Sequence, residues 1–323
     1  MKVEKEWNQN PAVGGLEENS GLCKILTASG SSLSFHEVFR MGEEYLNFCG
    51  ITDASVDAWL LLEHVTGISR TRFLLERTRE MPEESRMLYG RLLEKRGKHI
   101  PLQHLTGIQE FMGLEFQVNE HVLIPRQDTE ILVEEAMKQI RPGMRILDLC
   151  TGSGCIGISL VKLWSGGKLP AISVDCADIS EEALNVAQRN AESLNAEVRL
   201  IHSDLFRILD KTDGQSQLGT YDMIVSNPPY IQTSVIEELS EEVRLHEPFG
   251  ALDGKEDGLY FYRKIIRESR AHLTEEGRLL FEIGYDQGEV VSHLMKEQGF
   301  IDVRVKKDLA GLDRVVCGRL EKN

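Results

Sequence analysis

Short apolar runs of strand type alternate with segments of helical periodicity from residue 128 onward, and this alternation limits the fold more than any other feature. Such alternation is typical of an α/β fold with a doubly wound parallel sheet, because a helix usually carries the chain between parallel strands. The link at 307–312 is too short for a helix, so the last strand should run antiparallel. The expected strands are 145–149, 171–177, 198–203, 221–226, 278–283, 301–306 and 313–319, and the expected helices are about 128–140, 155–164, 180–194, 258–272 and 286–298.

Residues 33–105, which precede this α/β region, show helical periodicity only. Ser34 and Glu37 have the spacing of a capping box, Asp53 precedes a second apolar helical pattern as its N-cap, and Pro101 should end the helical block. We therefore expect a small N-terminal helical bundle over residues 33–105. Its predicted helices are 35–50, 54–64, 70–76 and 82–98.

The remaining segments connect to these two domains. Residues 1–32 are polar and lack periodicity, so we expect a flexible tail. Leu114, Phe116 and Val118 alternate with polar residues after a Met-Gly turn, which predicts a hairpin linker over 106–124. The α/β domain should then occupy residues 125–323.

Charge and composition bound the class of protein. The chain has 323 residues and a net charge of −15, and residues 106–323 hold 37 Asp and Glu against 24 Lys and Arg. A protein that binds nucleic acid directly would carry a basic surface, so we do not expect nucleic acid to be a direct partner of this chain. No apolar run reaches membrane-spanning length, and the N-terminus lacks an apolar signal core. We expect a cytoplasmic monomer. The six cysteines include no C-x-x-C pair, so no metal site is expected.

A glycine-rich turn joins the first strand of the α/β region to its helix, in the stretch RILDLCTGSGCIGISL. Gly152, Gly154 and Gly157 satisfy G-x-G-x-x-G, and Asp178 ends the next strand. Glycines let the backbone approach a ligand closely, and a carboxylate at that position accepts hydrogen bonds from a ribose diol. This loop predicts a nucleoside cofactor and leaves both a dinucleotide and S-adenosyl-L-methionine open. The neighbouring thiols of Cys150 and Cys155 are expected to be buried and unreactive.

Asp204 ends the third strand, where doubly wound folds place ligands. We expect its carboxylate to accept from an adenine amino group, with Leu205 or Phe206 against the base. A helix N-cap is the alternative role for this aspartate.

The fourth strand ends in Asn227, Pro228, Pro229 and Tyr230. Each proline fixes its own φ and restricts the residue before it, so the Asn227 side-chain oxygen and the Pro228 carbonyl should be held rigidly side by side. Two converging acceptors suit a planar NH₂ group, on which the Tyr230 ring can stack. They would also stabilise positive charge that develops on that nitrogen during methyl transfer. The tetrapeptide therefore favours methylation of an amide or aromatic amine, and it argues against a dehydrogenase.

The chain resembles the release-factor glutamine-N5 methyltransferases, the PrmC/HemK family. The matching segments span about residues 33–320: PLQHLTGIQEFMGLEF (101–116), LIPRQDTE (123–130), LDLCTGSGCIGISL (147–160), ADISEEALNVAQRN (177–190), SDLF, VSNPPYI, HEPFGALDGKEDGL (246–259), FEIGYDQG (281–288) and KKDLAGLDRVV (306–316). The resemblance implies a seven-stranded, Rossmann-like S-adenosyl-L-methionine-dependent methyltransferase sheet, with S-adenosyl-L-homocysteine as product. It also implies methylation of the glutamine in the Gly-Gly-Gln loop of peptide-chain release factors.

The resemblance assigns roles residue by residue. Substrate contacts and catalysis would fall on Asn227, Pro228, Pro229 and Tyr230. This chain departs from the family at Cys150, which is usually glycine, at Leu205, which is commonly aromatic, and at Gln127, which is often proline. Cofactor contacts would fall on Cys150, Thr151, Gly152, Ser153, Gly154, Asp178, Leu205 and Asn227. We add Asp204 to them because it ends the third strand.

Other substrates and roles stay open at this point. A glutamine of a ribosomal protein is the nearest alternative substrate, followed by an exocyclic amine of nucleic acid, and a nucleotide-dependent oxidoreductase or inactive binding module is the alternative class. Asp128 or Thr129 is expected either to cap the helix after 127 or to help close the site. Glu282 is expected either to orient the site or to be a structural acid, and Glu247 and Asp257 are expected to be surface charges.

Overall fold

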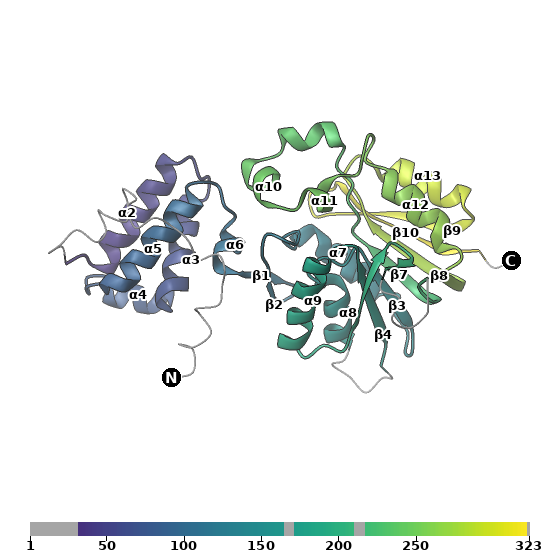
Figure 1. Cartoon of the computed structure of the whole chain (residues 1–323), viewed down its shortest axis with the longest axis horizontal. Coiled ribbons are helices and arrows are strands. Elements are labelled where there is room, and N and C mark those ends of the chain that lie inside the picture. Colours follow the sequence, from purple (N-terminus) through teal and green to yellow (C-terminus); the bar gives the residue numbers. More distant parts are fainter. Residues whose placement is uncertain (1–31, 165–170, 210–216, 322–323) are drawn as a thin grey trace. The chain divides into compact units, whose positions relative to one another are not determined.

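One mixed sheet forms the core of the α/β region in the computed structural model, which describes residues 32–164, 171–209 and 217–321. The strand order is β6-β5-β4-β3-β7-β8-β10-β9 (Figure 1). β3 pairs in parallel with β4 and β7, β4 pairs with β5, and β7 pairs with β8. The bounds are β3 (Arg145–Leu149), β4 (Ser173–Asp178), β5 (Arg199–Asp204), β6 (Arg207–Ile208), β7 (Tyr221–Ser226), β8 (Leu273–Glu282), β9 (Phe300–Lys307) and β10 (Asp313–Leu320).

The last strand runs antiparallel, as the short link before it predicted. β10 lies between β8 and β9 and is antiparallel to both. We expected seven strands in this sheet, and among the described residues it has eight. The additional strand, β6, has only two residues and folds back antiparallel on β5 at Asp204 and Arg207. So short a strand leaves no periodicity in the sequence.

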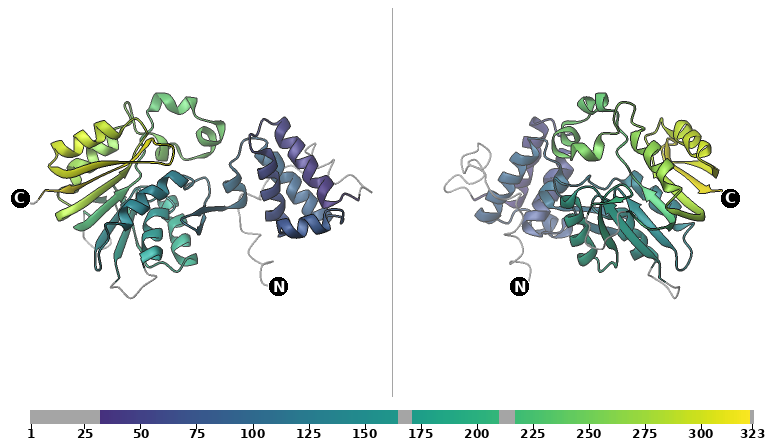
Figure 2. Two further views of the ribbon diagram at one scale, coloured as in Figure 1. Left: turned by 180° about the vertical axis from the view of Figure 1, so that it is seen from behind. Right: turned by 45° about the vertical axis from the view of Figure 1, so that its right-hand side comes forward.

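Helices cover both faces of the sheet, which makes three layers (Figures 1 and 2). Neighbouring residues of β3 point to opposite faces: Ile146 packs with the first group of helices and Leu147 with the second. Both faces are apolar, as expected for a sheet buried on two sides. The first group is α7 (Gln127–Met137), α8 (Cys155–Trp164) and α9 (Glu181–Ser193), and the second is α12 (Tyr260–Ser269) and α13 (Gly288–Glu297).

The expected hairpin is present, and it belongs to the α/β unit. β1 (Ile108–Phe111) and β2 (Leu114–Gln117) pair antiparallel around the Met-Gly turn. The Met112 N–H donates to Glu130 Oε1 of α7 at 2.6 Å, and Asn190 of α9 exchanges two hydrogen bonds with the Gln117 backbone, at 2.7 and 3.0 Å. The hairpin is therefore anchored to two helices of this unit.

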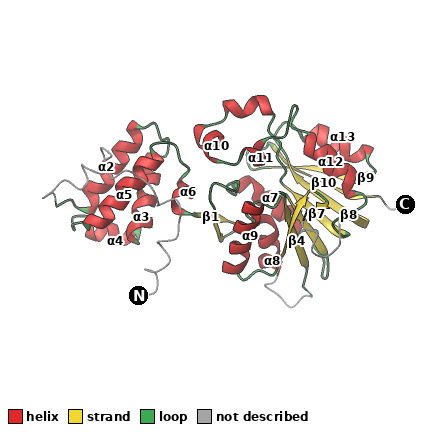
Figure 3. Cartoon of the chain, viewed as in Figure 1, coloured by secondary structure: helices red, strands yellow, loops and turns green. Residues whose placement is uncertain are grey.

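The chain divides into two compact units, and Figure 3 shows that one of them contains helices only. This helical unit comprises the residues up to 107 together with 241–246, and the α/β unit comprises 108–240 and 247 onward. The predicted tail lies outside the described residues apart from residue 32. None of the described helices is both long and apolar enough to cross a membrane.

The helical unit contains α2 (Phe35–Phe48), α3 (Ala54–Thr66), α4 (Arg70–Glu76), α5 (Glu83–Arg96), α6 (Leu102–Thr106) and α10 (Glu241–His246). The Ser34–Glu37 capping box is formed. Asp53 holds the N-cap position of α3, but its side chain makes no capping hydrogen bond. Pro101 does not end the helical block, because its φ of −54° suits the residue that precedes α6. α10 is held by Arg96, whose guanidinium donates to Glu242 at 2.5 Å and to Asp57 at 2.6 Å.

Candidate active site

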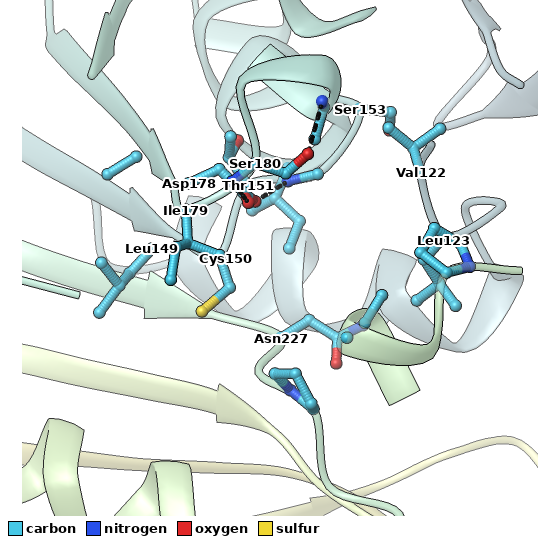
Figure 4. A pocket seen from close by; sticks show the side chains of 18 of the residues that line it. Val122, Leu123, Leu149, Cys150, Thr151, Ser153, Asp178, Ile179, Ser180 and Asn227 are labelled. Carbon is cyan, nitrogen blue, oxygen red and sulfur yellow. Dashed lines mark hydrogen bonds between the residues drawn. The ribbon is translucent and has the colours of Figure 1, made fainter. Parts of the chain in front are cut away.

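The carboxyl ends of β3, β4, β5 and β7 meet at one edge of the sheet and border a cavity of about 350 Å³. Parallel strands deliver whatever follows them to the same edge, which is where doubly wound folds bind ligands. Figure 4 shows Thr151, Ser153, Asp178 and Ser180 gathered on one side of the cavity, with Asn227 on another side and Leu123 on a third.

Most of the predicted site residues border this cavity. They are Cys150, Thr151, Gly152, Ser153, Asp178, Asp204, Leu205, Asn227 and Pro229. Gly154, Pro228 and Tyr230 are absent from its lining. Gly154 has a φ of +80°, and a Cβ there would lie 2.8 Å from Ile158 and 3.2 Å from Ala187, so this glycine permits close packing of the loop.

Two further segments complete the lining, and both overlap stretches that carry the family resemblance, 123–130 and 246–259. Segment 121–126 contributes Val122, Leu123 and Arg126, and segment 248–261 contributes Lys255 and Phe261, among others. Residues 121–126 show no helix or strand periodicity, and Phe261 lies in an expected helix, 258–272, so pattern alone did not connect either segment with the sheet edge.

The glycine loop is held by a buried aspartate at the end of β3. Asp148 Oδ2 accepts from the Thr151 hydroxyl at 2.5 Å and from the Gly157 N–H at 2.9 Å. Burial raises the pKa of Asp148 to about 6. Cys150, which lies between Asp148 and Thr151 in the chain, has a φ of +62°. This left-handed conformation costs a non-glycine residue roughly 1–2 kcal/mol. A glycine at position 150, which the family resemblance implies, would adopt this conformation without that strain.

The thiols beside the loop are protonated, and Cys155 is buried while Cys150 is half-buried beside the cavity. Burial raises the pKa of Cys150 and of Cys155 far above the ordinary range for cysteine. A reactive thiol needs a lowered pKa. The expectation of two unreactive thiols agrees with these surroundings.

Asp178 presents a partly used carboxylate at the end of β4. It accepts from the Gly152 N–H at 2.8 Å and from the Ser180 N–H at 3.0 Å. Burial raises the pKa of Asp178, and these hydrogen bonds act in the opposite direction. A carboxylate has about four acceptor positions, so acceptor capacity remains for a ligand such as a ribose diol.

Asp204 is not a helix N-cap, because the chain turns from it into β6. Its carboxylate lies 3.3 Å from Arg207 and 3.6 Å from Lys264. Leu205 follows with a φ of +53°, is buried, and borders the cavity.

The tetrapeptide leaves β7 and is fixed at both ends. Asn227 Nδ2 donates to the Thr129 hydroxyl at 3.4 Å, which leaves Asn227 Oδ1 free of that bond. The Tyr230 hydroxyl donates to Glu282 Oε1 at 3.3 Å, and the Tyr230 carbonyl accepts from Gln287 Nε2 at 3.1 Å. The Tyr230 ring packs against the apolar core of the α12 and α13 face.

Segment 253–258 lies directly against the end of the tetrapeptide. Ile231, the residue after the tetrapeptide, is bonded to this segment, since the Gly254 N–H donates to the Ile231 carbonyl at 2.7 Å. A Cβ on Gly254 would lie 2.7 Å from the Tyr230 backbone, and one on Gly258 would lie 2.4 Å from the Tyr230 carbonyl oxygen. Only glycine allows so close an approach.

The geometry bears on the alternative roles expected for Asp128 and Thr129 of α7 and for Glu282 of β8. α7 begins at Gln127, and neither Asp128 nor Thr129 caps it. Asp128 lies 3.1 Å from Arg314 of β10, while Thr129 borders the cavity beside Asn227. Glu282, at the end of β8, is buried and accepts from the Tyr230 hydroxyl, which fits both roles expected for it.

Glu247 is not a surface charge: it is 7% exposed. Its carboxylate accepts from the Arg126 guanidinium and, at 3.4 Å, from the Ile124 N–H. A buried carboxylate needs such partners, and these fasten segment 121–126 to the segment after α10. Asp257, by contrast, is a surface charge that pairs with Arg263.

Comparison with known proteins identifies the family. The model of the PrmC N-terminal domain matches residues 37–107, and the model of the methyltransferase small domain matches 126–243. The chain is 40% identical to the release factor glutamine methyltransferase of Clostridium botulinum over 282 residues, which covers 86% of this chain and 96% of that protein. It is also 40% identical to the protein of the same name from Geobacter sulfurreducens, over 85% of this chain and 93% of that one.

Among solved structures, the chain is similar to the release factor-specific protein-(glutamine-N5) methyltransferase from Alicyclobacillus acidocaldarius. It is 30% identical, covers 64% of this chain and 99% of its own, and has a TM-score of 0.37. Sequence identity of 40% over nearly the whole length of the curated relatives, together with the two domain matches, places this chain in the release factor glutamine methyltransferase family.

Proposed function

We propose that this chain transfers a methyl group from S-adenosyl-L-methionine to the side-chain amide nitrogen, N5, of the glutamine in the Gly-Gly-Gln loop of peptide-chain release factors. Family membership supports the substrate, and the site supports the chemistry. The observation that carries the proposal is the position of Asn227, which borders the same cavity as the glycine loop and Asp178.

The residues around the cavity fit a nucleoside cofactor. Asp178 keeps acceptor capacity beside its bonds from Gly152 and Ser180, and a ribose diol offers hydrogen-bond donors to it. The left-handed backbone at Cys150 turns the loop edge toward the cavity. Leu205, which is buried and borders the same cavity as Asp204, would offer an apolar surface for a base. When bound, S-adenosyl-L-methionine supplies a methyl group on a positively charged sulfur, and no pyrophosphate needs to be held.

The tetrapeptide would hold the acceptor nitrogen. Asn227 Oδ1 and the Pro228 carbonyl oxygen would accept the two hydrogens of the glutamine amide, which orients its nitrogen toward the methyl group. The same two oxygens would stabilise positive charge on the nitrogen as the new bond forms. The hydrogen bond from Asn227 Nδ2 to Thr129 supports this orientation, because it leaves Oδ1 as the free acceptor.

Tyr230 would contribute its ring rather than its hydroxyl. Burial raises the pKa of Tyr230 well above the ordinary value, so the hydroxyl stays protonated and donates to Glu282. A protonated phenol is no general base at neutral pH. The amide proton would leave to water after transfer.

The test uses the full chain, isotope-labelled S-adenosyl-L-methionine and an intact release factor. We expect label on one glutamine peptide, located by tandem mass spectrometry, and none on a release factor whose loop glutamine is alanine. Parallel reactions contain ribosomal proteins or DNA. Label confined to either of those substrates would overturn the proposal.

A further inference from the structure

Gln287, at the start of α13, bonds to the tetrapeptide and not to its own helix. It holds the N-cap position of α13, but its side chain makes no capping hydrogen bond. Its Nε2 donates to the Tyr230 carbonyl at 3.1 Å and to the Gly258 carbonyl at 3.4 Å, and its Oε1 accepts from the Gly284 N–H at 2.9 Å. Gln287 is 8% exposed. This one buried amide therefore joins three segments of the α/β unit.

The three partners fix which end of the Gln287 amide faces the tetrapeptide. Two carbonyl oxygens can only accept, so they require the NH₂ end, and a backbone N–H requires the oxygen end. The NH₂ group has two hydrogens, and Tyr230 and Gly258 accept them. An exchanged amide would place its oxygen against both carbonyls and its NH₂ against the Gly284 N–H, so all three bonds would be lost.

Two glycines make room for this amide. A Cβ on Gly258 would lie 2.8 Å from Gln287 Nε2, and one on Gly284 would lie 3.0 Å from Gln287 Oε1. Both distances are shorter than an ordinary van der Waals contact, so a side chain at either position would push the amide away from its partners. The backbone on both sides of Gln287 is thus shaped to hold it.

The far end of the tetrapeptide depends on contacts from outside it. Its two prolines have no N–H to donate, so a regular backbone ladder cannot hold this stretch. Its beginning is fixed by β7, and just beyond it the Ile231 N–H donates to the Leu252 carbonyl at 3.0 Å. Gln287 adds the bond to the Tyr230 carbonyl, next to segment 253–258.

Segment 253–258 is itself fixed by a buried aspartate. Asp253 is 5% exposed, and its Oδ1 accepts from the Thr233 hydroxyl at 2.5 Å and from the Lys255 N–H at 3.0 Å. Its Oδ2 accepts from Lys255 Nζ at 2.7 Å. The Thr233 N–H donates in turn to the Lys255 carbonyl at 3.0 Å. The segment therefore offers a fixed support for the end of the tetrapeptide.

We propose that Gln287 is a positioning residue for methyl transfer, whose amide holds the end of the tetrapeptide against segment 253–258 and the loop after β8. This inference rests on the proposed function, in which the Pro228 carbonyl oxygen and the Tyr230 ring meet the substrate amide. A proline of fixed φ separates these two residues, so a shift at one is passed to the other. A misplacement of about 1 Å can cost about a hundredfold in rate. Loss of the Gln287 amide should therefore lower turnover more than binding.

Two variants remove the donors of Gln287 in different ways. Gln287→Glu keeps the length and an acceptor oxygen for Gly284, but an ionised carboxylate cannot donate to a carbonyl. Gln287→Asn keeps the amide on a shorter side chain, which does not reach the tetrapeptide. Asparagine is also favoured at an N-cap, so α13 should still begin at this position. Glu256→Gln, an exposed position in segment 253–258, is the matched control.

The first readout is steady-state methyl transfer by the full chain to an intact release factor. Both Gln287 variants should lower kcat by about ten- to a hundredfold. Their KM for the release factor should stay near wild type, since a protein interface usually involves about 20–30 residues on each side. Their affinity for S-adenosyl-L-homocysteine should also stay near wild type, since Tyr230 is absent from the cavity lining.

Glu256→Gln should behave like the wild type in all three measurements. Wild-type kcat in either folded Gln287 variant would overturn the inference, and so would a loss of cofactor affinity as large as the loss of kcat. If Gln287→Glu does not fold, as judged by its melting temperature, Gln287→Asn decides the matter.

Hydrogen exchange gives a readout that does not depend on the acceptor. With S-adenosyl-L-homocysteine present, the backbone amides of Ile231 and Thr233 should exchange about threefold to tenfold faster in the Gln287 variants, and at the wild-type rate in Glu256→Gln. Unchanged exchange in both Gln287 variants would overturn the positioning role whatever the substrate is. Faster exchange in these variants, with no methyl transfer by the wild-type chain to release factors, would instead refute the proposed function alone.

Discussion

The ionisation of Glu282 provides a quantitative test of the buried environment at the end of β8. Its pKa is raised from 4.5 to about 7, chiefly by burial. The folded state therefore holds this proton more tightly than the unfolded chain does. Between these two pH values only the unfolded chain ionises, so the contribution of Glu282 to stability is fully present below pH 4.5 and is lost as the pH rises through 7.

The size of this effect follows from the shift. At 1.36 kcal/mol per pKa unit, the difference between 4.5 and about 7 corresponds to about 3 kcal/mol. Glu282→Gln is neutral at every pH and lacks this dependence. The free energy of unfolding of Glu282→Gln minus that of the wild type should therefore increase by about 3 kcal/mol between pH 4.5 and pH 8.5.

Urea unfolding measures this difference. Trp164 lies on α8 of the α/β unit, so its fluorescence reports on that unit in a background that carries Trp7→Phe and Trp59→Phe. Both proteins are measured in that background at several pH values. A stability difference that stays constant from pH 4.5 to pH 8.5 would mean that Glu282 ionises normally, and the account of its burial would be refuted.

Three further predictions concern the site and its support. Asn227→Ala should lower kcat by about a hundredfold or more while its affinity for S-adenosyl-L-homocysteine, measured by calorimetry, stays near wild type, because a lost transition-state acceptor affects the chemical step; unchanged turnover would remove Asn227 from the mechanism. Asp178→Ala should weaken the binding of the same ligand by about tenfold or more, since hydrogen bonds to a charged group contribute about 1.5–3 kcal/mol each; an unchanged dissociation constant would exclude the carboxylate from the cofactor site. Gly258→Ala should lower the melting temperature and kcat, because its Cβ would lie 2.4 Å from the Tyr230 carbonyl oxygen at a φ of +72°. Gly250→Ala, where a Cβ has nothing within 4 Å, is the stability control, and equal melting temperatures for the two variants would contradict the packing argument.

The long elements could be predicted from the sequence because their patterns repeat over many residues. The strand before Cys150 and the helix after it follow from an apolar run, a glycine turn and a helical period. β6 and α6 could not be predicted, because two and five residues are too short for a period. The antiparallel β10 was predictable because a six-residue link excludes a crossover helix.

Some residues of the candidate site could likewise be predicted from the sequence, and others could not. Cys150, Asp178, Asp204 and Asn227 could be placed together because each follows a parallel strand, and such strands end at one edge. Glu247 could not be placed, because its burial depends on Arg126 and Ile124, more than 120 residues earlier in the chain. The contact of Thr129 with Asn227 likewise joins residues 98 positions apart, and no local pattern encodes it.

The most direct measurement is the structure of the chain bound to S-adenosyl-L-homocysteine and a release factor. The account predicts the glutamine side chain of the Gly-Gly-Gln loop in the cavity at the end of β7, with its NH₂ within hydrogen-bonding distance of both Asn227 Oδ1 and the Pro228 carbonyl oxygen. A glutamine amide seated away from these two oxygens, in a complex that still transfers the methyl group, would contradict it.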